Sequence, residues 1–414
     1  MPTRRAATGP HVLRAMNADA VLAALRAAET PAVSVTALAT ATGLSRPAVT
    51  RALAALAEGG LVESVTAAPE AAAAPGRPAQ HVRFRAEAGH VAGIDIGPHK
   101  VLVVIADLAG GPRAERRVTV GQDIDGPGLF ETVRTALTAA VAEAGIAPAD
   151  LRAVSVGTPG IVDRERGEIL LAPSIPGWAG LPVVPRLREW LHCPVLIDND
   201  VDLAVLGERW RGGSGDADSL VFVQWGERIG AGMLLDGRPF RGAGGAAGEL
   251  GFIDVRCGEA PGGEVPGGAV GDDVSAAPLT STLGPFERLA GAAAIRRLAQ
   301  EAGVALGPEG EIGPLFTAAA AGDPAAAAVV DRAAARFARG LATLVLLLDP
   351  GRVVIGGGLS RAGETLLGPV RRHLRDRTLT TAEVTASVLG ERAVAVGALR
   401  RALDAVEPTL TASA

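Results

Sequence analysis

The chain has 414 residues and a formal net charge of −5, and 48% of its residues are hydrophobic but only 3% aromatic. This length suffices for two or three folded units with sizeable cores. Two cysteines, Cys193 and Cys257, exclude a disulfide framework and match no metal-binding spacing. The longest strongly apolar run, residues 341–348, is too short to span a membrane, and charged residues interrupt the apolar stretch near the start, so we expect a cytoplasmic protein with no membrane partner.

The segment Val35–Leu61 has the form of a helix-turn-helix. Gly43 permits a sharp turn, and Ser45 can cap the second helix. That helix repeats apolar residues at the spacing of one buried face, namely Val49, Ala52, Leu53 and Leu56. Its opposite face carries Arg46, Thr50 and Arg51, which with Ser45 are candidates to contact phosphates and base edges in a major groove. An ordinary helical hairpin with a solvated basic face is the alternative interpretation.

The surroundings of this motif favour a DNA-binding unit over residues 1–88. Residues 1–90 carry nine arginines against six acidic residues, a weak positive footprint. A preceding helix is predicted at Asp19–Ala28, and strands at Leu61–Val65 and His81–Phe84 flank a turn rich in Ala, Pro and Gly. Two strands after a recognition helix predict a wing, with Arg77 near its tip as a candidate minor-groove contact or, equally, a solvated arginine.

From Val91 onward the chain alternates short apolar strands with long helices, which predicts an α/β architecture with buried sheets. The expected strands are 91–96, 101–106, 117–120, 153–156, 195–197, 220–224, 232–235 and 352–355. The expected helices include 128–144, 201–211, 284–302 and 324–347. Residues 258–284 are dominated by Gly, Pro and Ala and are predicted to be a long loop.

Several strand-ending turns have the chemistry of a nucleotide or sugar site. Asp95 and Gly97 precede Lys100, the one lysine of the sequence, in a turn suited to a phosphate and magnesium. Asn199 and Asp200 stand between a strand and a helix, where a carboxylate can take a proton from a bound hydroxyl, although helix capping explains the pair equally well. Two further glycine-rich turns contain Gly226 and the pair Gly357–Gly358.

Taken in order, these motifs resemble the ROK family of repressors, open reading frames and kinases across nearly the whole chain. The N-terminal matches are to its regulator branch: Leu13-Arg14, Thr42-Gly43-Leu44-Ser45, Gly60-Leu61-Val62 and Gly76-Arg77-Pro78. The matches to the shared sugar-kinase body are Gly93–Gly97 with Lys100, Gly157–Gly160 with Trp178, Asn199-Asp200, Gly242–Gly251 and Gly356–Gly358.

The resemblance implies a winged helix-turn-helix followed by a two-lobed, actin-like α/β fold of the sugar-kinase and Hsp70 type. The implied boundaries are 1–88 for the DNA-binding domain, 89–200 with a C-terminal helix 391–406 for the first lobe, and 201–390 for the second lobe with a dimerisation surface. It also implies that Asn199, Asp200 and Glu249 bind a sugar, with Asp200 as the catalytic base of a kinase, and that Asp95, Gly97, Lys100, Gly226, Gly357 and Gly358 surround ATP.

The sequence departs from the family pattern at its zinc and phosphate elements. Phe252 replaces a histidine that contacts the sugar and ligates zinc, and Cys257 stands where the family has three cysteines, so no metal is expected. The second phosphate loop reads Gly226-Glu227-Arg228 instead of Gly-Thr-Gly. Glu227 would repel a polyphosphate, whereas Arg228 adds bulk or pairs with a phosphate, so binding of ATP with magnesium remains open.

Three functions remain in view. The first is a transcriptional regulator, as a repressor of carbohydrate genes, that binds a double-stranded DNA operator as a homodimer or dimer of dimers and senses a sugar or sugar derivative. The second is an ATP-dependent, glucokinase-like sugar kinase with an accessory DNA-binding domain, favoured by Asp95, Lys100 and Asp200. The third is a ROK-like body that acts solely as a dimerisation scaffold.

Overall fold

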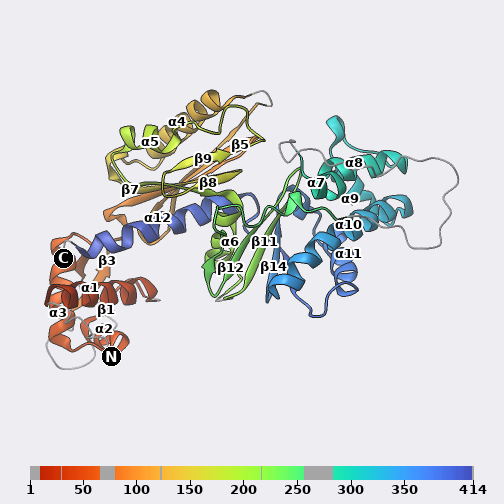
Figure 1. Cartoon of the computed structure of the whole chain (residues 1–414). Helices are drawn as coiled ribbons and strands as arrows, with labels where there is room; N and C mark the ends of the chain where they lie inside the picture. The colour runs from red at the N-terminus through yellow and green to blue at the C-terminus, as the bar shows by residue number, and fades with distance from the viewer. Residues whose placement is uncertain are drawn as a thin grey trace, which may run out of the picture.

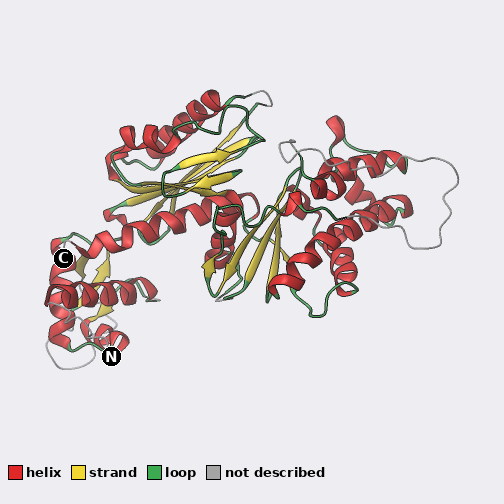
Figure 2. Cartoon of the chain, in the orientation of Figure 1, coloured by secondary structure: helices red, strands yellow, loops and turns green. Residues whose placement is uncertain are grey.

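The computed structural model describes residues 10–28, 30–65, 80–121, 124–215, 217–255 and 283–412. These residues form a small N-terminal unit and two larger α/β lobes (Figures 1 and 2). Among them, no helix has the length and apolar character needed to cross a membrane.

The N-terminal unit packs three helices with a small antiparallel sheet of strand order β1-β3-β2. Its elements are α1 (Pro10–Ala27), β1 (Val33–Ser34), α2 (Val35–Thr42), α3 (Arg46–Glu58), β2 (Val62–Val65) and β3 (His81–Phe84). Helix α1 begins at Pro10 instead of the expected Asp19, because apolar periodicity marks the half of the helix that is buried and not its exposed first turns.

The helix-turn-helix is built by local capping. Helix α2 ends at Gly43, whose φ of 68° turns the chain in the left-handed region that glycine adopts without strain. The Ser45 hydroxyl then accepts a hydrogen bond from the backbone N–H of Ala48 at 3.4 Å and starts α3. The four apolar residues predicted to face the core are all buried: Val49, Ala52, Leu53 and Leu56.

The first lobe contains a five-stranded sheet of order β10-β7-β4-β5-β6. Strands β10, β7 and β4 are parallel, whereas β5 and β6 continue from β4 as antiparallel hairpins. Its elements are β4 (His90–Ile96), β5 (Lys100–Asp107), β6 (Pro112–Thr119), α4 (Gly126–Glu143), β7 (Leu151–Thr158), β8 (Ile161–Asp163), β9 (Glu168–Leu171), α5 (Val183–Leu191) and β10 (Val195–Asn199).

The second lobe repeats this arrangement with a sheet of order β13-β12-β11-β14-β15. Strands β11, β14 and β15 are parallel, and β12 and β13 form the antiparallel hairpins. Its elements are α6 (Asp200–Arg211), β11 (Leu220–Trp225), β12 (Ile229–Leu235), β13 (Arg238–Pro239), α7 (Pro285–Ala290), α8 (Ala292–Glu301), α9 (Gly313–Ala320), α10 (Pro324–Leu348), β14 (Arg352–Gly356), α11 (Glu364–Arg375) and β15 (Glu383–Ala386).

Helices α6 and α12 (Ala393–Ala412) lie between the two sheets and pack against each other (Figure 1). Helix α12 covers β4 and β7 of the first sheet, and α6 covers β11 and β12 of the second. The outer faces of the sheets carry α4 and α5 in the first lobe and the α7–α11 group in the second (Figure 2). The fold is therefore the two-lobed, actin-like α/β fold that the sequence predicts.

Two details differ from the sequence-based expectation. Residues 284–302 form two helices, α7 and α8, because the chain is extended at Gly291 and the next N–H, of Ala292, donates to the carbonyl oxygen of Gly226 instead of continuing the helix. The short strands β1, β8, β9, β13 and β15 were not expected, since two to four residues give too few alternations to detect.

Candidate functional site

The exposed side of α3 presents the residues predicted to contact DNA. Ser45, Arg46, Thr50 and Arg51 are all exposed. The hydroxyls have local partners, since Ser45 caps α3 and Thr50 Oγ1 donates to the carbonyl oxygen of Arg46 at 3.0 Å. Neither Arg46 nor Arg51 has an ion-pair partner within the described part of the chain, which leaves both guanidinium groups available. Arg77 lies in residues 66–79, outside the described residues.

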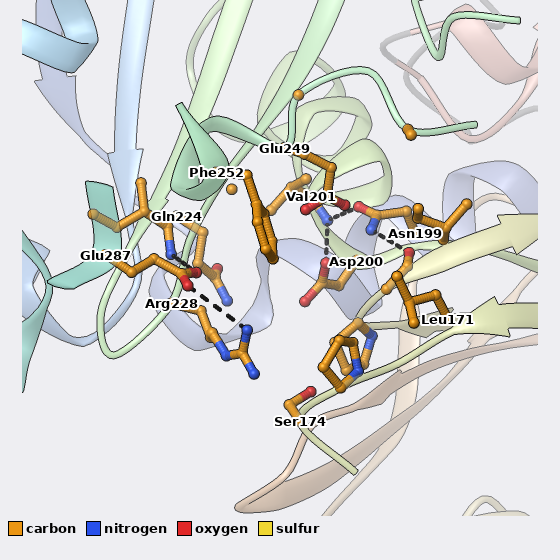
Figure 3. Close-up of a pocket in the computed structure, with 18 of the residues that line it drawn as sticks. Leu171, Ser174, Asn199, Asp200, Val201, Gln224, Arg228, Glu249, Phe252 and Glu287 are labelled. Carbon is orange, nitrogen blue, oxygen red and sulfur yellow. Dashed lines mark hydrogen bonds and ion pairs between the residues drawn. The ribbon is translucent and has the colours of Figure 1, made fainter. Parts of the chain in front are cut away.

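A pocket of about 320 Å³ opens where the two lobes meet, at the ends of β7, β10 and β11 (Figure 3). Three residues predicted to bind sugar line it, namely Asn199, Asp200 and Glu249. They come together because β7 and β10 are parallel neighbours whose ends share one edge, while Glu249 follows a loop whose Gly248 carbonyl accepts a hydrogen bond from Ala231 on β12. Asn199 ends β10 of the first lobe, Asp200 begins α6 at the junction of the lobes, and Glu249 belongs to the second lobe.

Asn199 caps helix α6, and both Asn199 and Asp200 line the pocket, so the two interpretations of the pair hold together. The Asn199 Oδ1 accepts from the N–H of Val201 at 2.9 Å, and its Nδ2 donates to the carbonyl oxygen of Gly160 at 2.8 Å. These bonds orient the amide at the start of α6 and fix the adjoining turn. Burial, and then the nearby charges of Asp95 and Glu249, raise the pKa of Asp200 to about 7. A carboxyl group with that pKa is suited to exchange a proton near neutral pH.

Glu249 and Phe252 face this pair from the second lobe. Burial, and then repulsion from Glu287, raise the pKa of Glu249. The ring of Phe252 points into the pocket between Asp200 and Gln224 (Figure 3). Because a phenyl ring has no lone pair, Phe252 supplies neither a sugar hydrogen bond nor a zinc ligand.

Arg228 and Glu287 form an ion pair on the same side of the pocket as Gln224. The Arg228 Nη1 lies 3.7 Å from Glu287 Oε2 (Figure 3). Glu287 is 3% exposed and also accepts hydrogen bonds from the N–H groups of Ile229, at 3.0 Å, and Gly284, at 2.7 Å. Arg228 therefore meets a carboxylate of its own chain, and Glu227, which the sequence marks as repulsive to a polyphosphate, is paired with Arg296.

The residues predicted to surround ATP lie outside the pocket lining. Lys100 Nζ lies 2.8 Å from Asp95 Oδ2 and donates to the carbonyl oxygen of Glu391, so its charge is used within the chain. Burial raises the pKa of Asp95 despite this lysine. Gly97 donates to the carbonyl oxygen of Lys100 and closes the β4–β5 turn. Gly226 and the pair Gly357–Gly358 are adjacent, because the parallel strands β11 and β14 end side by side.

No group of three or more His, Cys, Asp and Glu side chains among the described residues is arranged to hold a metal ion. Cys257 lies in residues 256–282, outside those described, so the expectation that the chain holds no zinc stays a prediction. Phe252 does not fit a zinc site, since it offers no ligand atom. Cys193 lies elsewhere, and burial raises the pKa of its thiol to about 11.

Two polar pocket residues, Ser174 and Gln224, have no clear sequence signal, and neither does the pairing of Glu287 with Arg228. Gln224 belongs to an apolar strand, and Ser174 to a loop that no motif marks. Glu287 sits far along the chain from Arg228, and the segment between them carries no recognisable pattern. A helix-turn-helix joined to a two-lobed, actin-like body with a polar pocket between its lobes is the class of protein that the geometry defines.

Comparison with known proteins places the chain within that class. Residues 91–405 match the ROK family, and residues 15–66 match the IclR helix-turn-helix domain. The chain belongs to the ROK family. Over 322 residues it is 30% identical to a glucokinase of Halalkalibacterium halodurans, covering 74% of this chain and 92% of that relative.

The chain is also similar to a repressor in sequence and to the solved structure of a regulator in fold. The xylose repressor of Caldicellulosiruptor bescii is 26% identical over 328 residues, covering 76% of this chain and 78% of the repressor. The crystal structure of a ROK family transcriptional regulator, a homolog of the E. coli Mlc protein, superposes with a TM-score of 0.75 at 21% identity, covering 97% of this chain and 99% of that one. This last likeness shows the shared fold.

Proposed function

We propose that this protein is a DNA-binding transcriptional regulator, a repressor of carbohydrate-related genes, whose ROK body binds a sugar or sugar-derived effector. The observation that carries the proposal is α3, which exposes Arg46, Thr50 and Arg51 on a unit whose core is continuous with that of the body. The match to the IclR helix-turn-helix domain and the similarity to a xylose repressor support it.

The proposal assigns one set of residues to the DNA and another to the effector. Arg46, Thr50 and Arg51, with Ser45 at the helix start, contact the operator in the major groove, and Arg77 enters a minor groove. Asn199, Asp200 and Glu249 bind the effector. We place the DNA-binding domain at 1–88, the first lobe at 89–200 with 391–406, and the second lobe at 201–390.

An effector in the pocket acts through the arrangement of the two lobes. Since Asn199 comes from one lobe and Glu249 from the other, with Asp200 at the junction between them, a ligand that touches all three favours the arrangement that brings them together. Its influence on DNA affinity cannot exceed its differential affinity for the two arrangements. Two copies of the chain would read a pseudo-palindromic operator, with one α3 in each half-site.

DNA binding is tested with a labelled fragment from upstream of the gene itself, by fluorescence anisotropy at several salt concentrations. We expect affinity to fall steeply as salt rises, because arginines that neutralise phosphates release counterions. The Arg46→Ala/Arg51→Ala double variant should bind at least about tenfold more weakly and show a smaller salt slope.

The control is Arg297→Ala/Arg332→Ala, which removes two exposed arginines from the second lobe, far from α3. It should bind DNA as the unmodified chain does. Equal binding by the Arg46/Arg51 variant would show that α3 is not the recognition helix. A solution molecular mass equal to a single chain, with and without DNA, would contradict the dimer.

A sugar kinase is the second candidate, favoured by Asp200, whose pKa of about 7 suits a general base, and by the 30% identity to a glucokinase. Opposed to it are Phe252 and the Arg228–Glu287 pair beside the second phosphate loop. Coupled ATP turnover over a panel of sugars decides the matter. Turnover that is lost in Asp200→Asn would establish the kinase, and no turnover with any sugar would remove it.

The dependence of DNA affinity on sugar concentration distinguishes a regulator that senses an effector from a body that acts solely as a dimerisation scaffold. A body that acts solely in dimerisation would give the same DNA affinity at every sugar concentration. Release of DNA by one sugar and not by its isomers would exclude it.

A further inference from the structure

We propose that the pocket prefers a sugar carrying a protonated amine, which binds between the carboxylates of Asp200 and Glu249 and against the ring of Phe252. This inference rests on the proposed function, because it names the chemical class of the effector. It deepens the assignment of the pocket from sugars in general to cationic amino sugars.

The carboxyl groups that line the pocket outnumber its cations. Asp200, Glu249 and Glu287 all line it, and Arg228 is the cation that faces them. Arg228 pairs with Glu287, the residue that also holds two backbone N–H groups. Within the described part of the chain, Asp200 and Glu249 have no ion-pair partner at contact distance, and Arg228 acts on Glu249 only as a nearby charge. The pocket therefore presents three carboxyl groups to one guanidinium group.

Asp200 and Glu249, which line the same pocket, also repel each other. Burial, then the charge of Asp95 and then that of Glu249 raise the pKa of Asp200. A neutral sugar donates hydroxyl hydrogens to the carboxylates but leaves this repulsion in place. A ligand ammonium between them removes it, and the interaction is stronger than in water because both residues are half-buried.

Phe252 adds an aromatic ring to the same pocket. Phe252 points into the cavity near Asp200 (Figure 3) and presents a π-face with partial negative charge. An ammonium over such a ring gains a cation–π attraction, which is larger where water is excluded. A ring and two carboxylates that converge on one cavity form a site for a cation, whereas a histidine at the same position would add a hydrogen-bonding or positive group.

The alternative ligand is an anionic sugar held by Arg228. It would have to displace Glu287 from Arg228 and enter a cavity that holds two further carboxyl groups. Displacing Glu287 would leave its buried carboxylate without a counter-charge. The charges of the pocket therefore favour the amine.

The test compares glucosamine, glucose, N-acetylglucosamine and glucose 6-phosphate, by titration calorimetry on the full chain near neutral pH. These probes share one ring and differ in charge. We expect glucosamine to bind at least about tenfold more tightly than glucose, and N-acetylglucosamine to lose that advantage. At about pH 6, where the amine of glucosamine is already protonated before it binds, the cation stabilises the ionised form of Asp200. Glucosamine binding should then release protons, as measured in buffers of different ionisation enthalpy, whereas glucose binding should not.

Two variants locate the preference. Glu249→Gln keeps the shape and hydrogen-bonding capacity of the side chain but removes its charge, so the ratio of glucosamine to glucose affinity should fall by about tenfold. Phe252→Leu keeps an apolar group without the π-face and should lower the same ratio. The control is Glu189→Gln on α5, an exposed glutamate outside the pocket lining, which should leave the ratio unchanged.

Each outcome bears on the proposal. Equal or tighter binding of glucose, or tighter binding of glucose 6-phosphate, overturns the amine preference and leaves the effector pocket intact. A preference for glucosamine that survives both pocket variants also overturns it, because the amine then binds elsewhere. If none of the four probes binds, this inference fails, while anisotropy with operator DNA separately shows whether the regulator proposal stands.

Discussion

Asp202, in the first turn of α6, belongs to a buried charge cluster at the junction of the lobes. Its Oδ2 lies 3.3 Å from Arg241 Nε, and Arg241 Nη2 lies 2.8 Å from Asp198 Oδ2. Arg164 adds a second cation at 3.1 Å from Asp198. Within the described part of the chain, Asp202 Oδ1 has no hydrogen-bond partner. Burial, and then repulsion from Asp198, raise the pKa of Asp202 to about 7.

This raised pKa predicts a direction for the pH dependence of stability. The folded state binds a proton at Asp202 more tightly than the unfolded chain does, so its contribution is lost as pH rises through about 7. The free energy of unfolding should fall with pH by up to about 1.4 kcal/mol per pH unit for such a group, and Asp200 acts in the same direction. Asp202→Asn should flatten this fall and stabilise the chain above neutral pH, measured by urea unfolding across the pH range.

The exposed Asp376, at the end of α11, gives the matched control. Asp376→Asn should leave the pH dependence as it is. A fall with pH that stays equally steep in Asp202→Asn would mean that Asp202 is ionised throughout and that Arg241 neutralises it fully.

Individual pocket residues differ in how well the sequence predicted them. Asn199, Asp200 and Glu249 were placed together because each belongs to a short motif whose order along the chain is recognisable. The sequence left open whether Arg228 adds bulk to the phosphate loop or pairs with a phosphate. It did not predict the ion pair with Glu287, since Glu287 follows a long segment without a recognisable pattern. An ion pair between distant segments is decided by packing, which local patterns do not record.

At the scale of elements, the contact of α6 with α12 depends on glycines that let two backbones approach. A Cβ on Gly397 would overlap the carbonyl oxygen of Leu203, and one on Gly207 would overlap that of Ala393. Helix α6 starts at the pocket with Asp200, and α12 continues to the N-terminal unit, so this crossing connects the two candidate sites.

Gly397→Ala should therefore lower the free energy of unfolding by about 1–3 kcal/mol or more, because one helix must move. Gly368→Ala, inside α11, is the control, since a Cβ there meets no atom within 4 Å apart from its chain neighbours. Because Pro369 follows, and a Cβ before proline disfavours the helical conformation, this clash opposes the gain in helix propensity, and the variant should change the free energy of unfolding by less than about 1 kcal/mol. Denaturant unfolding measures both, and equal effects would show that α6 and α12 adjust to the methyl group without strain.

For the molecule as a whole, one hydrophobic cluster joins the N-terminal unit to the first lobe. It contains Val21 and Leu22 of α1, Leu102 of β5, and Leu399 and Leu403 of α12, all buried. Polar contacts reinforce it: Arg26 of α1 pairs with Glu407 of α12 and donates to the carbonyl oxygen of Leu108 at 2.8 Å. The helix-turn-helix is thus packed onto the body.

This continuity predicts that the N-terminal unit and the first lobe unfold together. Leu403→Ala should cost about 2–5 kcal/mol and speed amide hydrogen exchange in both α1 and β4, because the lost side chain belongs to their shared core. Leu346→Ala, at an exposed position of α10, should change neither. Exchange that quickens in β4 while α1 keeps its protection would show that the two units are independent.

The sequence by itself determined the helix-turn-helix and the α/β class. These depend on short-range spacing: helical periodicity, capping residues and turns at strand ends, all recorded within a few neighbouring residues. The grouping of Asn199, Asp200 and Glu249 came instead from the resemblance of their motifs to those of the ROK family. The tertiary structure alone decided that Arg228 pairs with Glu287, that Phe252 points into the pocket, and that α12 joins the core of the DNA-binding unit to the body. Such features depend on contacts between residues far apart in the chain, whose partners are chosen by packing and charge once the elements have assembled.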